Sequence, residues 1–235
     1  MSLMDDILRK RASDRHAELM DRVYRSQSGI YDLSRKYYLL GRDQLIEALE
    51  PPAGGRVLEI GCGTARNLVQ AAKAWPEAEF YGFDISSEML KAARKNLAHA
   101  GMQGRITLFH GDAENPGRAM PHALRTFDRI FLSFCLSMIP DWQSAIRQAL
   151  TLLAPGGELH IVDFGQSEQL PSAFRSLLQE WLALFHVEPR KHLRAFLAEL
   201  DSEIGTRSEF VPMYRGYSWR FVVRLPEATA GPDEI

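Results

Sequence analysis

The amino-acid sequence predicts an α/β fold with a doubly wound, mostly parallel β-sheet, an N-terminal helical cap and a C-terminal antiparallel strand pair. Three observations lead to this prediction. Short apolar runs alternate with helix-length segments, a glycine-rich turn follows the first run, and two adjacent strand-like segments come late in the chain. Parallel strands need helical crossovers and are buried on both faces, which accounts for runs that are apolar throughout.

Three segments divide the chain. Residues 1–50 are expected to form a helical cap or lid, because apolar side chains recur there at helical spacing. The breaker PPAGG leads into the main domain, which is predicted over residues 51–225 and includes a helical insertion at 168–203. Residues 226–235 are predicted to be a frayed tail.

Within the main domain, apolar runs and turn residues set the order of the elements. Asp141 is the expected N-cap of the last helix before the insertion, and APGG is expected to end that helix. The insertion itself predicts two helices, around 170–186 and 189–203. The expected strands are 57–60, 78–85, 105–113, 127–136, 158–165, 208–215 and 217–225, the last two joined across Gly216.

Composition excludes several classes of protein. With 46% hydrophobic residues, 25% charged residues and a net charge of −2, the chain lacks the basic excess of a nucleic-acid binder. Its longest apolar stretch, residues 130–139, is too short to span a bilayer. The two cysteines, Cys62 and Cys135, favour a reducing cytoplasm, and no Cys/His spacing predicts a metal site. The sequence leaves the oligomeric state open.

The stretch VLEIGCGTARNL, residues 57–68, places a glycine turn between a strand and a helix. A dinucleotide-binding fingerprint would have a third glycine where Arg66 stands, so that fingerprint fails. Glu59 precedes Gly61 by two residues; its carboxylate would repel a pyrophosphate but can serve an ammonium group. The turn is therefore expected to hold a nucleoside without phosphates, although a plain tight turn is the alternative.

Two further strand ends carry acids. Asp84 follows the next strand at roughly the 20-residue spacing of a ribose-binding acid, and Asp112 with Ala113 follows the third strand, where both are expected beside an adenine. The alternatives are a helix cap for Asp84, a role that Ser86 fills equally well, and a turn role for Asp112. Adenine, ribose and an amino-acid arm without phosphate together describe S-adenosylmethionine.

The motifs VLEIGCGTA, YGFDIS, HGDAEN and LLAPGG, in this order, resemble those of class I S-adenosylmethionine-dependent methyltransferases over roughly residues 40–225. Ala65 stands where that family usually has its third glycine. The resemblance implies a Rossmann-like fold, methyl transfer and S-adenosylmethionine as cofactor. The cofactor-binding residues expected are Arg42, Glu59, Gly61, Cys62, Gly63, Asp84, Ile85, Met89, Asp112, Ala113, Ser133 and Phe134.

For two of these residues, the alternative to binding the cofactor is a purely structural role. Arg42 is expected to hold the cofactor's carboxylate with its fork of donors, or else to form a surface salt bridge. Met89 is expected on the adenine face or in the core. Ser133 and Phe134 are placed beside the methionine part by the resemblance alone.

The methyl acceptor is expected to be a small molecule or a lipid. SFCLSMIPDW lacks the Asn/Asp-Pro-Pro-aromatic motif of nucleic-acid amine methyltransferases. Tyrosines cluster before the main domain, and aromatic faces can hold quaternary ammonium groups, although a lid or core role is the alternative. Helix 171–185 has an apolar face for an acyl chain, for peripheral membrane contact or for covering the sheet; its polar face is poor in Lys and Arg, which weakens membrane contact.

A finer resemblance rests on YRSQSGIYDLSRKYYLLGRD, SMIPDW and LPSAFRSLLQEWLALFHVEPR. These stretches are similar to the N-methyltransferases of bacterial betaine-lipid synthesis, which implies trimethylation of the amine of diacylglyceryl homoserine. The alternatives are a methyltransferase of a soluble small molecule or quinone precursor, and a non-catalytic cofactor-binding protein.

Amine methylation requires that a proton leave the ammonium before each attack. Asp163 and His186 are the candidate bases, since Asp163 ends a strand and histidine titrates near neutral pH. Tyr31, beside Asp32, is the predicted functional member of the tyrosine cluster. Proton loss to solvent before binding is the alternative, and it needs no base.

Overall fold

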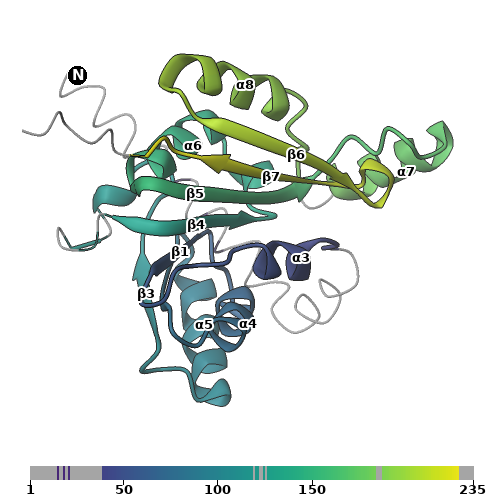
Figure 1. Cartoon of the computed structure of the whole chain (residues 1–235). Helices are drawn as coiled ribbons and strands as arrows, with labels where there is room; N and C mark the ends of the chain where they lie inside the picture. The colour runs from purple at the N-terminus through teal and green to yellow at the C-terminus, as the bar shows by residue number, and fades with distance from the viewer. Residues whose placement is uncertain are drawn as a thin grey trace, which may run out of the picture.

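The computed structural model describes residues 39–118, 120–121, 124, 126–183 and 187–227, together with Arg15, Glu18 and Asp21. Its centre is one seven-stranded sheet of order β3-β2-β1-β4-β5-β7-β6 (Figure 1). The five strands from β3 to β5 are parallel, and β7 runs antiparallel to both β5 and β6. The strands are β1 (Arg56–Ile60), β2 (Glu79–Asp84), β3 (Ile106–His110), β4 (Phe127–Ser133), β5 (Leu153–Phe164), β6 (Arg207–Met213) and β7 (Ser218–Arg224). The predicted fold class is confirmed.

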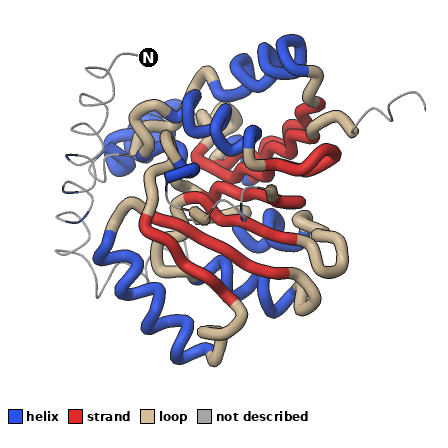
Figure 2. The backbone as a smooth tube through the Cα atoms, turned by 90° about the vertical axis from the view of Figure 1, so that its left-hand side faces the viewer, coloured by secondary structure: helices blue, strands red, loops and turns tan. Residues whose placement is uncertain are grey.

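Helices cover both faces of this sheet (Figure 2). One core cluster joins the sheet to α6 and α8, and a second joins the opposite face to α3, α4 and α5. The helices are α3 (Arg42–Glu47), α4 (Arg66–Ala74), α5 (Ser87–Ala100), α6 (Trp142–Thr151), α7 (Ser172–Ala183) and α8 (Leu193–Ile204), with 3-10 turns at Pro116–Arg118, Leu136–Met138 and Tyr214–Gly216. Most of the predicted N-terminal cap, and the tail beyond residue 227, lie outside the described residues.

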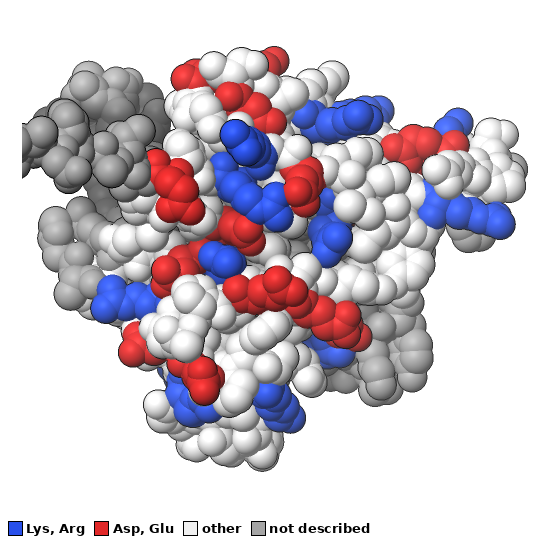
Figure 3. Space-filling view, viewed as in Figure 1, with Lys and Arg blue, Asp and Glu red and all other residues white. Residues whose placement is uncertain are grey.

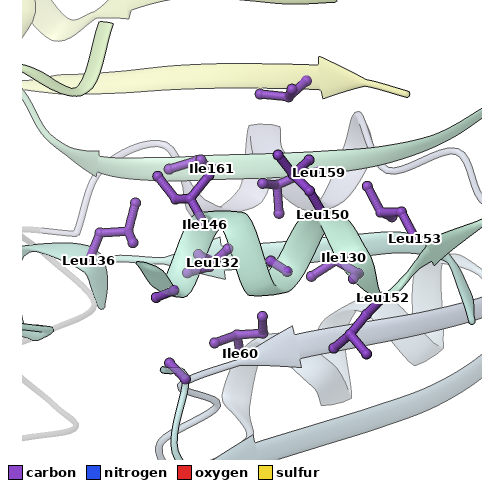
Figure 4. Packing of buried hydrophobic residues seen from close by; sticks show 14 of the residues in the cluster. Ile60, Ile130, Leu132, Leu136, Ile146, Leu150, Leu152, Leu153, Leu159 and Ile161 are labelled. Atoms are coloured by element: carbon purple, nitrogen blue, oxygen red, sulfur yellow. The ribbon is translucent and has the colours of Figure 1, made fainter. Parts of the chain in front are cut away.

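The first core cluster shows why α6 forms where it does. Ala145, Ile146, Ala149 and Leu150 recur at helical spacing and are buried against β4 and β5 (Figure 4). Asp141 is the N-cap, as predicted, because its side chain accepts a hydrogen bond from the N–H of Ser144 at 3.1 Å. This packing holds α6 against β4 and β5.

The start of β5 differs from the sequence prediction. APGG was expected to end α6 and precede the strand, but β5 already begins at Leu153, which pairs with Phe127. A register shift between Phe127 and Arg129 absorbs the glycine turn, in which Gly156 has a φ of 71°. A bulge lets a strand carry such a turn without ending, which a sequence pattern does not reveal.

Helix α7 covers the sheet with only part of its apolar face. Leu182 is buried, and Leu178 and Trp181 pack partly buried against the second core cluster. Leu177, on the same helix, is 63% exposed. Figure 1 shows α7 at the end of the molecule where β6 and β7 are joined. Within the described part of the chain, no helix has the length and apolarity that crossing a membrane requires.

Charged side chains of both signs are interspersed over the face of the molecule drawn in Figure 3. No broad patch of one sign covers the described part of that face.

Gly82 in β2 is predicted to tolerate no side chain. A Cβ there would lie 2.5 Å from Cδ1 of Leu68 and 3.0 Å from Cβ of Cys62. We expect Gly82→Ala to lower the free energy of unfolding by about 1–3 kcal/mol, because the buried Leu68 side chain and the turn at Cys62 must shift to admit the methyl group. Urea denaturation measures this. Gly104→Ala is the matched control, since a Cβ at Gly104 meets nothing within 4 Å; equal stability of the two variants would contradict the packing.

Candidate active site

A cavity lies at the edge of the sheet where the parallel strands end in their carboxyl termini, the usual place for a ligand in an open α/β sheet. The turns after β1, β2, β3 and β4 all contribute to it. Its lining consists of Leu39, Arg42, Glu59, Gly61, Cys62, Gly63, Thr64, Arg66, Asn67, Phe83, Asp84, Ile85, Gly111, Asp112, Ala113, Glu114, Ser133, Phe134, Cys135, Met138, Ile139, Pro140 and Asp141.

Eleven of the twelve predicted cofactor-binding residues belong to this lining. The exception is Met89, which is 5% exposed and does not line the cavity. Its N–H donates to Oγ of Ser86, the N-cap of α5, at 3.2 Å. The structure therefore places Met89 in the interior, the second of its two expected roles, while the cofactor contacts of the other eleven stay predictions.

The glycine turn after β1 is held in a conformation that favours glycine. Gly61 has a φ of 70° and Gly63 a φ of 52°. The N–H groups of Gly61 and Cys62 both donate to the carbonyl of Phe83, at 2.9 and 3.0 Å, which ties the turn to β2. A Cβ on Gly61 would lie 2.9 Å from Cβ of Cys135, whereas one on Gly63 would meet nothing within 4 Å. Gly63 thus leaves an open approach to the backbone.

Ala65, the departure from the family's third glycine, adopts a left-handed conformation with a φ of 60°. An L-residue pays roughly 1–2 kcal/mol for this conformation. Ala65 is fully buried and its N–H donates to the carbonyl of Cys62 at 2.8 Å, so the surrounding contacts maintain the strain. The small side chain fits the turn although the backbone favours glycine.

Asp84 joins the glycine turn to the end of β2. Its Oδ2 accepts from the N–H of Gly63 at 2.8 Å, and its Oδ1 accepts from the N–H of Ser86 at 2.9 Å. Ser86, not Asp84, caps α5. The cap alternative for Asp84 is therefore wrong, and its carboxylate, 9% exposed, stands at the cavity.

Asp112 does form a turn, since its Oδ1 accepts from the N–H of Glu114 at 2.9 Å. It lines the same cavity as Asp84, so the turn role and a ligand role are compatible. Ala113, 9% exposed, lies beside it in the lining.

Glu59 is the most deeply buried acid of the cavity, with 1% of its surface exposed. Its Oε1 accepts from Nδ2 of Asn67 at 2.8 Å, and its Oε2 has no hydrogen-bond partner among the described residues. Burial raises the pKa of Glu59 to about 8, against the lowering effects of Asn67 and of the Arg42 charge. A buried acceptor atom of this kind calls for a donor, and the ammonium of an amino-acid arm supplies one.

The charge of the lining distinguishes between nucleotide ligands. Among the described lining residues five carboxylic acids accompany two guanidinium groups, those of Arg42 and Arg66. This balance disfavours a polyphosphate. It suits S-adenosylmethionine, whose sulfonium and ammonium groups outnumber its single carboxylate. The cavity residues therefore fit that cofactor.

Several lining residues were missed from the sequence. Arg66 and Asn67 open α4, directly after the glycine turn, and Met138 and Ile139 follow β4. The feature of the sequence that could have identified them is their position shortly after the ends of β1 and β4. Among the described residues, no cluster of three or more His, Cys, Asp and Glu side chains has the arrangement of a metal site.

Of the three predicted catalytic residues, only Asp163 lies within the part of the chain that the structure describes. Asp163 is 3% exposed and does not line the cavity. Its carboxylate accepts from the N–H groups of Phe164 at 2.7 Å and Ser137 at 3.1 Å, and burial raises its pKa to about 6. These contacts suit a structural anchor better than a base. Tyr31 and His186 lie outside the described residues, so their roles stay predictions.

Comparison with known proteins agrees with this geometry. Residues 57–157 match a family model described as a methyltransferase domain. The demethylmenaquinone methyltransferase of Geobacillus kaustophilus is 30% identical over 84% of this chain and 87% of its own length. That of Listeria welshimeri is 26% identical over 87% and 89%.

Solved structures share the fold. The Haemonchus contortus phosphoethanolamine N-methyltransferase 2, in complex with S-adenosylhomocysteine, superposes with a TM-score of 0.67 at 18% identity, over 90% of this chain and 60% of its own. An O-methyltransferase family protein from Burkholderia thailandensis gives 0.66 at 16% identity, over 84% and 60%.

Fold and cavity together define an enzyme that binds S-adenosylmethionine as methyl donor. The chain belongs to the class I S-adenosylmethionine-dependent methyltransferases, the family of the relatives that it matches along most of its length.

The buried Glu59 predicts a pH-dependent cofactor affinity. In the free protein its pKa is about 8, and a bound ammonium favours the carboxylate and lowers that pKa. Affinity for S-adenosylhomocysteine should therefore rise from pH 6 to pH 8, by up to about tenfold per unit, and level off above the free pKa. Calorimetry measures this.

Glu59→Gln should bind more weakly at pH 8 and show a flatter pH dependence, which also corrects for titration of the ligand's own amine. Glu77→Gln, an exposed acid outside the cavity, is the control. A wild-type profile that matches the Glu59→Gln profile would contradict the assignment.

Proposed function

We propose that this methyltransferase acts on the amine of diacylglyceryl homoserine and carries it to the trimethylammonium form of a betaine lipid. The proposal rests on the long stretches, around residues 24–43, 137–142 and 170–190, that resemble the corresponding N-methyltransferases. The excess of acids in the cavity lining supports it, because a negative lining attracts an ammonium and tolerates its methylated, permanently cationic products.

The apolar part of the lining supports an amphipathic acceptor. Leu39, Met138, Ile139 and Pro140 line the cavity alongside the acids, so the lining offers apolar surface as well as charge. Leu177 of α7 is an exposed apolar side chain, and contact with an acyl chain would cover it. An amine that carries fatty chains matches both kinds of surface.

Bound S-adenosylmethionine would supply a methyl group on a sulfonium, which an amine nitrogen attacks in line. Glu59 and the neighbouring Arg42 would hold the cofactor's amino-acid end, and Asp84 the ribose. Glu59 and Asp84 lie at the ends of β1 and β2, and Arg42 begins α3. Anchors on such elements would fix the methyl carbon in place, and proximity would supply much of the rate.

Each of the five carboxylic acids in the described cavity lining already accepts a hydrogen bond from the protein. No His, Lys or Tyr is among the described lining residues, and burial raises the pKa of Cys62 and Cys135 well above the usual value. This favours loss of the proton of the acceptor ammonium to solvent before the amine docks. His186, one of the two candidate bases, lies outside the described residues, so the alternative of a protein base stays a prediction.

A quinone precursor is the second candidate acceptor. The observation in its favour is the name of the relatives, demethylmenaquinone methyltransferase, at 26–30% identity over more than four fifths of the chain. These names support a quinone more directly than they support a lipid amine. The apolar wall would serve that acceptor as well, but the acidic lining gives it no particular advantage.

Methyl transfer to defined acceptors separates the two candidates. The protein is incubated with S-adenosylmethionine labelled in its methyl group and with vesicles that carry either diacylglyceryl homoserine or demethylmenaquinone. The proposal predicts one, then two, then three methyl additions to the lipid amine, resolved by mass spectrometry. Asp84→Ala, which removes the predicted ribose acid, is the inactive control. Methylation of the quinone without the amine, or of neither, would contradict the proposal.

A further inference from the structure

The connection between α7 and α8 reaches the wall of the cavity through one side chain. Nε of Arg190 donates to the carbonyl of Leu136 at 3.0 Å, and its Nη2 donates to the carbonyl of Ile139 at 2.7 Å. A longer contact of 3.4 Å joins Nη2 to the carbonyl of Ser137. One guanidinium group therefore spans the backbone of the short turn that follows β4, the turn that contributes Met138 and Ile139 to the cavity.

Glu188 and Asp163 also form hydrogen bonds with this turn. The N–H of Glu188 donates to the carbonyl of Ser137 at 3.0 Å, and Oε2 of Glu188 accepts from Nη1 of Arg190 at 2.9 Å. The N–H of Ser137 donates to Asp163 at 3.1 Å. The Arg190 side chain is only 14% exposed, whereas Glu188 is 83% exposed, so the guanidinium is committed to the turn rather than to a surface ion pair.

We propose that Arg190 is a positioning residue for methyl transfer, which fixes the Met138–Ile139 wall of the cavity from behind. The cofactor anchors Glu59, Gly63 and Asp84 belong to β1, to the turn after it and to the end of β2, and the hydrogen bonds of Arg190 reach none of them. The wall after β4 is thus the part of the cavity that depends on Arg190. The inference rests on the methyl transfer of the family and holds for a lipid amine or a quinone alike.

The chemistry of the contact demands an arginine. A planar fork of donors can serve two carbonyls of one turn together, whereas the single ammonium of lysine cannot span them in the same geometry. Loss of the fork leaves backbone carbonyls to find other partners and lets the turn shift. A displacement of about 1 Å between reacting groups is enough to slow a reaction by up to about 100-fold.

Arg190→Lys tests this with a matched control. Nη2 of Arg105 also donates to two backbone carbonyls, of Pro76 at 2.7 Å and Ala78 at 3.4 Å, and none of these three residues lines the cavity. Both lysine variants are assayed with labelled S-adenosylmethionine and a whole-cell extract. The summed label in lipid and aqueous fractions gives the transfer rate, and S-adenosylhomocysteine titration gives cofactor affinity.

Arg190→Lys should lower the transfer rate at least about tenfold and change S-adenosylhomocysteine affinity less than about threefold, whereas Arg105→Lys should change neither. In Arg190→Ala, millimolar guanidinium should restore part of the rate. Hydrogen exchange of residues 134–141 should be faster in Arg190→Lys than in the wild type. An unchanged rate with unchanged exchange, or losses of rate, affinity and Tm in parallel, would overturn the proposal.

The two proposals fail separately. Which fraction takes up the wild-type label tests the acceptor, while the fall caused by Arg190→Lys tests the positioning role whichever fraction is labelled. If the wild type labels neither fraction, the exchange measurement alone decides: faster exchange at 134–141 supports the role and unchanged exchange refutes it.

Discussion

The hydrogen bond from the N–H of Gly63 to the carboxylate of Asp84 is the contact on which the cavity depends. It joins the turn after β1 to the end of β2, two places that only a parallel arrangement brings to one edge of a sheet. The carbonyl of Phe83 reinforces the junction by accepting from the same turn. With these groups satisfied, the turn stays in a conformation that a free peptide would rarely adopt, and the space above Gly63 stays open.

A second constraint is the cost of burying charge. Glu59 sits in the interior with one oxygen bonded to Asn67, and burial, together with the nearby Asp84 charge, raises the pKa of its carboxyl to about 8. Such a group is stable as a carboxylate only beside a cation. The cavity thus has a built-in demand for a cationic ligand, and the acids after β2 and β3 increase it. The same carboxylates would repel the phosphates of a phosphate-rich nucleotide.

The sequence predicted the parallel sheet, its crossover helices and the C-terminal strand pair, because each depends on local hydrophobic patterns. It also predicted 11 of the 23 residues that line the cavity, because strand ends of a parallel sheet share an edge. The register of the first and second strands then brings Glu59 opposite Gly82 and within two residues of Asp84 in the pairing. These lining residues could be predicted from the order of the strands alone, without knowledge of any side-chain contact.

What the sequence missed depends on three-dimensional contacts between distant segments. Asn67 bonds to Glu59 only because α4 packs back over β1, and Met89 is buried in α5 just after the cap that Ser86 makes. Asp163 was a candidate base because it ends a strand, and the sequence did not reveal that the N–H of Ser137, in the turn after β4, donates to its carboxylate. Arg190 carries no motif at all; its role is visible only from the carbonyls that it reaches.

Binding selectivity tests the central claim, a cavity built for a cationic, phosphate-free nucleoside. Calorimetric titration of one protein preparation with S-adenosylmethionine, S-adenosylhomocysteine, ATP and NAD⁺ measures it directly. The account predicts saturable one-site binding of the two sulfur-containing nucleosides, weakened in Asp84→Ala, and no detectable binding of ATP or NAD⁺. Tight binding of ATP or NAD⁺ with no response to S-adenosylmethionine would contradict it.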